Sequence, residues 1–196
     1  RSEVYTDGEK TATYDAALTA AGCEKAAAFV NFCNAFEIPV LTLVNVDGYK
    51  NCKCNEKKIA KAAARLTYAF ANADVPKVTV VVGKANGTAG LTMNSKSIGS
   101  DIVYAWKNAK IGVMEAAPAV KIMYADEIAK ADNAAALINE KAAQYNEMQA
   151  SALAAAKRGY VDDIIEASET RQRVAAAFEM LFTKREDRPS KKHGTI

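Results

Sequence analysis

The chain has 196 residues, of which 50% are hydrophobic and 25% are charged, as in ordinary soluble globular proteins with one sizeable core. Its net charge of +3 is small, and outside the Lys184 to His193 tail the basic residues are scattered among acidic ones, which disfavours nucleic-acid binding. No apolar run approaches the roughly 20 residues that cross a bilayer, and the N-terminus has no apolar signal core, so we expect a cytoplasmic protein without membrane insertion. The first residue, Arg1, is not methionine, which indicates a fragment or a processed chain.

Residues 1–21 are polar and weakly patterned, with a turn signal at residues 6–8, and they predict a poorly structured lead-in. From Cys23 to Phe36, apolar residues repeat every three or four positions, which predicts an amphipathic helix that ends before Pro39. Val40 to Val46 then reads as an apolar strand. The inward face of the helix is predicted to hold Ala26, Phe29, Val30, Cys33 and Phe36.

Asn55 is a plausible N-cap for a long helix that runs to Ala73, with its lysines on a solvated face. Pro76 precedes a continuous β-branched run, which predicts a strand buried on both faces. Helices that alternate with strands in this way are typical of right-handed crossovers in a parallel sheet. The fold class is therefore α/β.

The stretch from Val78 to Met93 combines this buried strand with a cluster of small residues, which predicts a tight turn that leads into a helix. Backbone N–H groups in the first turn of a helix have no intrahelical partner, so they can stabilise an oxyanion without a charged side chain. Small residues at such a turn also serve close packing. Both interpretations remain open at this level.

The rest of the chain continues the α/β pattern. A polar loop from Asn94 to Ser100 leads to strands at Asp101–Trp106 and Lys110–Met114. The next elements are alanine-rich helices from Ala116 to Met148, a short strand at Val161–Ile165, and a final helix capped by Ser168 with a polar exit at Pro189. The final helix is predicted to turn Val174, Ala177, Phe178, Leu181 and Phe182 inward.

The four cysteines, Cys23, Cys33, Cys52 and Cys54, are predicted to be free thiols. The Cys52-Lys53-Cys54 motif lacks a second ligand pair at zinc spacing, so no metal site is expected. The single histidine, His193, lies in the polar tail, which argues against a nucleophilic site that depends on histidine.

From about Leu18 to the end, the segments resemble, in their order and their residues, the C-terminal half of the carboxyltransferase subunit of biotin-dependent acyl-CoA carboxylases and decarboxylases. The matching segments are Glu24 to Phe36, Ile38 through Tyr49, Val75 to Val80, Lys84 to Met93, Ser95-Lys96 with Gly99 and Asp101, Arg158 to Asp162, Thr170-Arg171, and Lys184 to Gly194.

This resemblance implies a crotonase-like fold of repeated strand-strand-helix units, with residues 22–196 forming the biotin-side half of the carboxyltransferase. It implies carboxyl transfer between N1 of carboxybiotin and the α-carbon of an acyl-CoA, with enolates stabilised by two holes of backbone N–H groups. The biotin-side hole falls on Thr88 and Ala89, which are the implied catalytic positions. The other hole lies in an N-terminal half that is absent from this chain, so we expect the chain alone to be inactive.

The resemblance also assigns binding positions. The biotin-binding residues that it implies are Asp47, Gly48, Tyr49, Asn86, Gly87 and Gly90, and Leu91 occupies a position that shapes acyl choice. The family usually has tyrosine where this chain has Asn86 and Gly90, and a second glycine at Thr88. The change at Gly90 is expected to remove a wall of the pocket and to alter acyl or biotin recognition.

The implied cofactor is biotin on a carrier protein, with no metal bound by this chain. The implied partners are acyl-CoA, a biotin carboxyl carrier, biotin carboxylase or decarboxylase subunits, and further copies of the chain in a homo-oligomer. An alternative is a catalytically quiet binding or assembly domain that keeps the fold. A crotonase-type hydratase or isomerase is disfavoured because such enzymes need placed carboxylates, and Glu115, the only acid near a strand end after the turn, reads as a solvated or capping residue.

Overall fold

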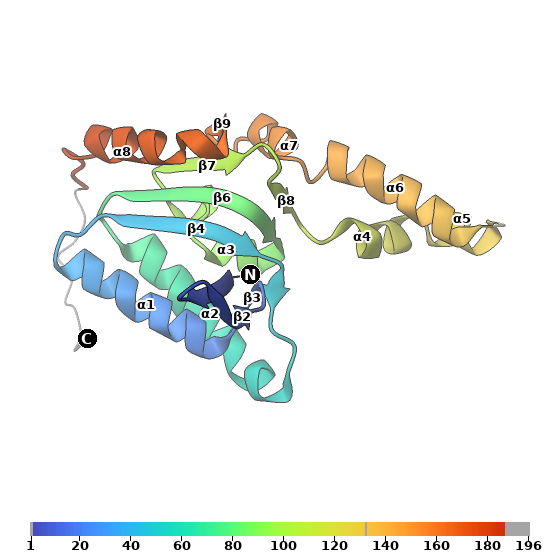
Figure 1. Ribbon diagram of the computed structural model, residues 1–196, viewed down its shortest axis with the longest axis horizontal. Helices are drawn as coiled ribbons and strands as arrows, with labels where there is room; N and C mark the ends of the chain where they lie inside the picture. Colours follow the sequence, from blue (N-terminus) through green and yellow to red (C-terminus); the bar gives the residue numbers. More distant parts are fainter. Residues whose placement is uncertain (1, 132, 187–196) are drawn as a thin grey trace.

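A five-stranded parallel sheet forms the centre of the molecule, with the order β4-β6-β7-β9 and with β8 paired to β6 (Figure 1). The computed structural model describes residues 2–131 and 133–186, so Pro189 and His193 lie outside the described residues. The strands are β1 Ser2–Thr6, β2 Glu9–Tyr14, β3 Ala17–Leu18, β4 Val40–Val46, β5 Gly48–Tyr49, β6 Lys77–Asn86, β7 Ile102–Trp106, β8 Lys110–Gly112 and β9 Asp163–Ile165. The α-helices are α1 Ala20–Ala35, α2 Lys53–Asn72, α3 Gly87–Thr92, α4 Ala116–Met123, α5 Ala125–Lys130, α6 Ala134–Met148, α7 Ala152–Lys157 and α8 Thr170–Met180.

Helices cover both faces of the sheet, as its apolar strands require. Val174 and Ala177 of α8 pack in one buried cluster with Val78 and Val80 of β6. On the other face, Ala89 of α3 belongs to a cluster that includes residues of α7 and of the facing strands. Helices α1 and α2 pack together below β4 in the view of Figure 1. The predicted α/β class with a parallel sheet is confirmed.

Strand β6 bends near its end. Val44 of β4 pairs with Val81, but Val46 pairs with Ala85, so β6 carries two additional residues in this interval. The first part of β6 pairs with β7, and Lys84 to Asn86 pair with β8 instead. An irregularity of this kind re-aims the residues that follow it. The bend therefore moves the last three residues of β6 from β7 to β8, and it sets the direction in which the following helix begins.

The prediction of a poorly structured lead-in over residues 1–21 is wrong. Strands β1 and β2 form an antiparallel hairpin, and β3 pairs in parallel with β5. The turn of the hairpin has positive φ at both central residues, Asp7 (52°) and Gly8 (83°). This is the geometry of a tight hairpin turn, for which Asp-Gly is a favoured sequence. The turn signal was therefore real, and its flanking segments are strands.

Three helix boundaries differ from the predictions. Helix α1 begins at Ala20, directly after the N-cap residue Thr19, rather than near Cys23. Helix α2 begins behind Cys52, and Asn55 is instead buried, where its Oδ1 accepts the Ala20 N–H at 2.6 Å. Helix α8 begins behind Glu169, while the predicted cap lies within a short 3-10 helix, Ala167–Glu169. The predicted inward aromatic residues Phe29, Phe36 and Phe182 are exposed.

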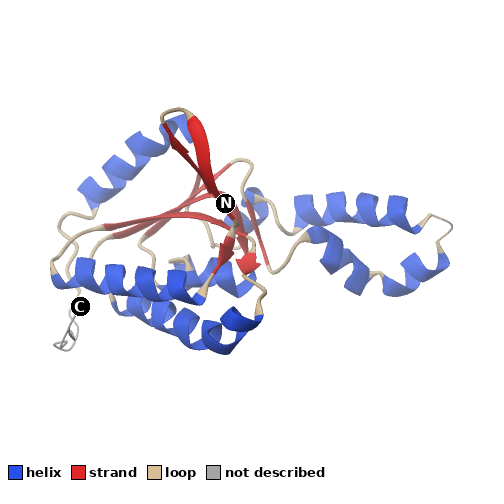
Figure 2. Ribbon diagram, turned by 60° about the horizontal axis from the view of Figure 1, so that its bottom comes forward, coloured by secondary structure: helices blue, strands red, loops and turns tan. Residues whose placement is uncertain are grey.

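The alanine-rich helices α4, α5 and α6 project from the body as an arm (Figures 1 and 2). In the described part of the arm, α5 and α6 contain no buried residue. Lys141 joins the helices through the ring of Tyr124, at 4.5 Å from its centroid, and through the carboxylate of Glu127, at 3.7 Å. Among the helices of residues 2–131 and 133–186, none has the length and apolarity needed to cross a bilayer.

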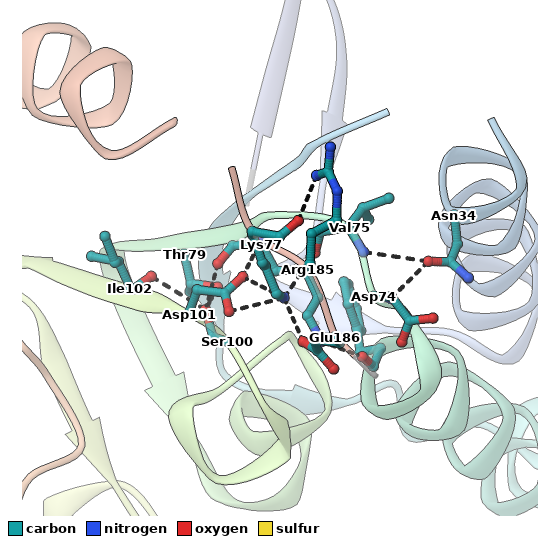
Figure 3. Close-up of polar contacts among 12 residues, drawn as sticks. Asn34, Asp74, Val75, Lys77, Thr79, Ser100, Asp101, Ile102, Arg185 and Glu186 are labelled. Atoms are coloured by element: carbon teal, nitrogen blue, oxygen red, sulfur yellow. Dashed lines mark hydrogen bonds and ion pairs between the residues drawn. The ribbon is translucent and has the colours of Figure 1, made fainter. Parts of the chain in front are cut away.

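The segment after α8 is tied to the beginning of β6 and β7. Lys184 Nζ lies 2.9 Å from Asp101 Oδ1 and 2.7 Å from Glu186 Oε1. The other oxygen of Asp101 accepts the backbone N–H of Lys77 at 2.7 Å. Figure 3 shows Asp101 beside Lys77, with Glu186 on the neighbouring segment. Since Lys184 and Asp101 are largely buried, these contacts fix the chain end against the sheet.

Candidate active site

The junction of β6 and α3 contains the predicted anion site, but it has no separate turn. Strand β6 continues to Asn86, and helix α3 begins directly at Gly87. Gly87 has a φ of +57°, and a Cβ at this position would lie 3.0 Å from the carbonyl oxygen of Val113. Glycine is therefore required at the sharp change of direction between the strand and the helix. Asn86 is buried at the N-cap position, and its side chain makes no capping hydrogen bond.

Gly90 brings α3 directly onto the end of β6. A Cβ on Gly90 would lie 2.7 Å from the carbonyl carbon of Ala85 and 2.9 Å from its oxygen, so the strand backbone occupies the place of a side chain. Gly83 lies close to the side chain of Asn45, since a Cβ on Gly83 would approach Asn45 Oδ1 to 2.4 Å. The small residues therefore serve close packing, and through it they set the position of the first turn of α3.

A small cavity of about 260 Å³ adjoins this first turn. It brings together two segments that are far apart in the sequence, residues 47–49 and residues 86–89, and both contain predicted site residues. Thr88 is exposed, whereas Ala89 is buried. The lining residues are Asp47, Gly48, Tyr49, Asn86, Gly87, Thr88, Ala89, Val113, Met114, Glu115 and Pro118.

Two predicted site residues, Gly90 and Leu91, line a different space. This large cavity has a volume of about 710 Å³, and Gly87 and Thr88 lie on the wall between the two cavities. Its floor is apolar and comes from the strands, while its polar edge carries side chains that include Arg158. The lining residues are Val44, Thr79, Val81, Ala85, Gly87, Thr88, Gly90, Leu91, Met93, Ser95, Lys96, Ser97, Val103, Ile111, Gly112, Val113, Tyr145, Gln149, Arg158 and Tyr160.

A charged cluster lies at the small cavity. Lys84 Nζ is 2.8 Å from Asp47 Oδ1 and 2.6 Å from Glu115 Oε1. These hydrogen bonds, first the one to Asp47 and then the one to Glu115, raise the pKa of Lys84 above its ordinary value. Glu115 is at the N-cap position of α4, as one of its two predicted roles implies, yet its carboxylate binds Lys84 instead of capping the helix. Sequence reasoning assigned no role to Lys84.

A chain of hydroxyl groups holds α3 from behind. Thr92 Oγ1 donates to the carbonyl oxygen of Thr88 at 2.9 Å, and Tyr49 OH lies 3.3 Å from Thr92 Oγ1. Because the one hydroxyl hydrogen of Thr92 goes to Thr88, Tyr49 is the donor in the second bond. Thr67 Oγ1 of α2 lies 3.3 Å from Thr92 Oγ1 and 3.0 Å from the carbonyl oxygen of Ala63, so its hydroxyl adds α2 to this chain of contacts. The sequence signal for Thr92 was only its position one helical turn after Thr88.

Asn94 fixes the other end of α3. It is fully buried and has a φ of +54°, a conformation that ends the helix. Its Nδ2 donates to Thr79 Oγ1 at 2.9 Å, and its carbonyl oxygen accepts from the same hydroxyl at 2.7 Å. Since Thr79 belongs to β6, this pair of bonds ties α3 to the centre of the sheet.

The arrangement favours charge stabilisation by backbone groups. The first-turn N–H groups of α3 have no intrahelical partners, and the positive end of the helix dipole adds to their field. Thr88 is not among the described residues with positive φ, so the change from glycine to threonine leaves its backbone helical. Among the described residues, no group of three or more His, Cys, Asp or Glu side chains could hold a metal ion. The four cysteines are free, as predicted.

Comparisons with known proteins identify the family of the chain. The family model for the carboxyl transferase domain matches residues 15–196. The putative propionyl-CoA carboxylase beta chain of Bacillus subtilis (strain 168) is 44% identical over 180 residues, which are 91% of this chain and 36% of that protein. The methylmalonyl-CoA carboxyltransferase 12S subunit of Propionibacterium freudenreichii subsp. shermanii is 43% identical over 174 residues, which are 88% of this chain and 33% of that protein.

Among solved structures, the transcarboxylase 12S crystal structure with methylmalonyl-coenzyme A and methylmalonic acid bound superimposes with a TM-score of 0.86 and 42% identity. The match covers 91% of this chain and 35% of that one. The predicted crotonase-like fold is therefore confirmed. The chain spans about a third of the length of the relatives that it matches. With a family model that covers nearly all of it, the chain belongs to the carboxyl transferase domain family.

Proposed function

We propose that the protein transfers a carboxyl group between carboxybiotin and the α-carbon of an acyl-CoA, and that this chain forms the biotin side of the active site. The observation that carries the proposal is the small cavity, in which residues 47–49 meet residues 86–89 at the first turn of α3. The similarity to a propionyl-CoA carboxylase beta chain and to a methylmalonyl-CoA carboxyltransferase subunit supports it.

The residues of the small cavity fit the head of a biotin group. Biotin, when bound, supplies N1 as the carrier of the carboxyl group and a ureido oxygen on which negative charge develops. Gly48, Gly87 and Ala89 leave room for a bicyclic ring, and Tyr49 and Val113 offer it apolar surface. The volume of about 260 Å³ admits a group of that size.

We assign the catalytic donors to the backbone N–H groups of Thr88 and Ala89. They point along the helix axis at its positive end, so they can bind the developing oxyanion without a change of protonation. Lys84 pairs with Asp47 and Glu115 and so neutralises part of the negative charge beside these donors. The side chain of Tyr49 positions α3 through Thr92, so its role extends beyond contact with biotin.

The hole for the acyl-CoA enolate belongs to the half that this chain lacks, and this chain contributes to the choice of acyl group through Leu91 at the large cavity. Leu91 is partly exposed at this cavity, where an apolar side chain favours an acyl group without a charge near the reacting carbon. Thr88 borders both cavities, so the two reacting groups can meet there.

The proposal includes the partners that the resemblance implies. Biotin arrives on a carrier protein, and biotin carboxylase or decarboxylase subunits act on the same carrier. Assembly into a homo-oligomer is supported by the hexamer assembly named for the transcarboxylase 12S structure. The cytoplasmic location stays a prediction.

The test uses the full-length protein that contains this chain. It is mixed with a biotinyl carrier that bears a labelled carboxyl group and with a panel of short acyl-CoAs, and the label in each acyl-CoA is counted. Transfer to at least one acyl-CoA is expected. Folded protein that transfers no label to any member of the panel would contradict the proposal.

A catalytically quiet assembly domain remains the competing hypothesis because of the unusual residues at Thr88 and Gly90. Nuclear magnetic resonance with free biotin separates the two. Shifts confined to the amides of residues 47–49 and 86–89 support the biotin site. A protein that assembles but shows neither these shifts nor transfer supports the quiet domain.

A further inference from the structure

Cys52 and Cys54 form a pair of thiols outside both cavities, at the start of α2. This end of α2 lies at the lower edge of the molecule in Figure 1, away from the sheet. The two Sγ atoms are 2.9 Å apart and share a hydrogen bond. Cys54 is exposed, and Cys52 is partly exposed. Two sulfur atoms that face each other and are open to solvent can exchange with an external disulfide.

We propose that Cys52 and Cys54 form a dithiol redox site that reacts with small-molecule disulfides, of which oxidised glutathione is the test case, to give a Cys52–Cys54 disulfide. The proposal is independent of the carboxyltransferase activity. It concerns a part of the chain to which neither the sequence motifs nor the two cavities assign a role.

The surroundings distinguish the two thiols. Cys52 is the N-cap residue of a 20-residue helix, where the dipole favours a negative charge. Hydrogen bonds from the Cys54 thiol and then from the Asn55 backbone lower the pKa of Cys52, and the same contact between the thiols raises the pKa of Cys54. Cys52 is therefore the attacking thiolate, and Cys54 is the thiol that resolves the mixed disulfide.

The reaction balances with one disulfide as the oxidant. The Cys52 thiolate attacks one sulfur of the external disulfide, forms a mixed disulfide and releases one thiolate. Cys54 then loses its proton to solvent and attacks Cys52 Sγ, which releases the second thiolate. Two cysteine thiols are oxidised to one disulfide, and the external disulfide is reduced to two thiols.

The local structure can accept this bond. The distance between the sulfur atoms, 2.9 Å, compares with about 2.05 Å in a disulfide, so a small rotation of the side chains closes the gap. Below the pair, the side chain of Asn55 holds the backbone of Ala20 and of Lys50, at 2.6 and 2.7 Å, which keeps the segment in place.

The other two cysteines provide an internal control. Cys23 and Cys33 are buried, with relative exposures of 0% and 2%, and burial raises the pKa of both thiols. Thiols in such surroundings react slowly with polar disulfides. The proposal therefore predicts oxidation at the exposed pair while Cys23 and Cys33 stay reduced.

The test equilibrates the full-length protein with mixtures of reduced and oxidised glutathione, blocks free thiols, and digests it with trypsin without reduction. Lys53 lies between the two cysteines, so trypsin releases residues 51–53 and 54–57 as separate peptides unless a disulfide joins them. We expect the linked species to increase with the proportion of oxidised glutathione. Its absence at saturating oxidised glutathione, or equal oxidation of Cys23 and Cys33, would overturn the proposal.

Single substitutions test the assigned order. Cys54→Ser removes the resolving thiol, so Cys52 should accumulate a stable mixed disulfide with glutathione. Cys52→Ser should react at least about tenfold more slowly, because the remaining thiol is not at the N-cap position, where the helix dipole favours a thiolate. Equal trapping rates in two variants with unchanged melting temperatures would show that the pair does not act as proposed.

Discussion

The substitution Gly90→Ala tests how closely α3 packs on β6. The added Cβ would lie 2.7 Å from the carbonyl carbon of Ala85, and ordinary contact begins at 3.4 Å, so the helix must move by at least 3.4 − 2.7 = 0.7 Å. Because the obstacle is backbone, we take the upper part of the range for overpacking, about 3 kcal/mol. The higher helix propensity of alanine offsets about 1 kcal/mol of this, which leaves a loss of about 2 kcal/mol.

The assay is thermal or urea unfolding of the full-length protein. A loss of about 2 kcal/mol lowers the melting temperature by roughly 4–8 °C in a domain of this size. The matched control is Gly48→Ala, because nothing lies within 4 Å of a Cβ there and the φ is not positive. A Gly90→Ala protein that is as stable as the control variant would refute the reasoning about the helix position.

The same displacement should reach the chemistry. The N–H groups of Thr88 and Ala89 move with α3, and a misplacement approaching 1 Å can reduce the rate on the order of 100-fold. We therefore expect Gly90→Ala to lower kcat for carboxyl transfer more than it raises KM. An unchanged kcat in a variant that shows the predicted loss of stability would contradict the proposal that these backbone N–H groups take part in the reaction.

Three further predictions concern other contacts of the chain. Asp101→Asn removes the carboxylate that pairs with Lys184 in a largely buried contact, and it should cost about 1–3 kcal/mol in urea unfolding. Tyr49→Phe removes the donor to Thr92 and should cost about 0.5–1.5 kcal/mol and lower kcat. In an NMR titration of its Nζ, Lys84 should show a pKa above the ordinary 10.5, because its ion pairs favour the charged form. The stability that these pairs contribute is fully present below the pKa of Lys84 in the unfolded state, and it is lost as the pH rises through the pKa of Lys84 in the folded state.

The chain offers a control for each substitution. Asp163 pairs with Arg173 at 3.7 Å with both side chains about half exposed, so Asp163→Asn should change the stability by less than about 0.5 kcal/mol. Tyr68 is 70% exposed, so Tyr68→Phe should have no effect. Losses in these controls as large as those in Asp101→Asn and Tyr49→Phe would contradict the structural argument, and a titration of Lys84 at or below 10.5 would contradict its pairing.

Much of the fold could be predicted from the sequence because apolar residues recur at the spacing of helices and strands, and because prolines mark the ends of elements. The strand at Val40–Val46 has its predicted bounds, since Pro39 precedes it and a polar turn follows. The hairpin of β1 and β2 was missed because its strands are short and polar, although Asp7-Gly8 carried a hairpin signal. The sequence analysis did not predict that Phe29 is exposed. The spacing of apolar residues shows that they share one face of the helix, but it does not show which of them the neighbouring elements cover.

Features of the candidate site that lie within one sequence segment could be predicted from the sequence. Contacts between residues of distant segments could not. The buried strand and the helix start around Thr88 were predicted from the local sequence pattern, and the catalytic role of Thr88 stays a prediction from the family resemblance. The contacts of Lys84 with Glu115, and of Tyr49 with Thr92, join residues 31 and 43 positions apart. Such pairs depend on strand register and on the bend of β6, which the linear pattern does not contain.

The central claim is that a backbone N–H at residue 88 stabilises the oxyanion on the biotin side. The most direct measurement compares carboxyl transfer by full-length Thr88→Ala and Thr88→Pro, after unfolding experiments have shown that both variants are folded. Alanine retains the N–H and proline removes it within the first helical turn, where proline is tolerated. We predict that kcat of the proline variant lies on the order of 100-fold or more below that of the alanine variant. Equal kcat values in two folded variants would contradict the account.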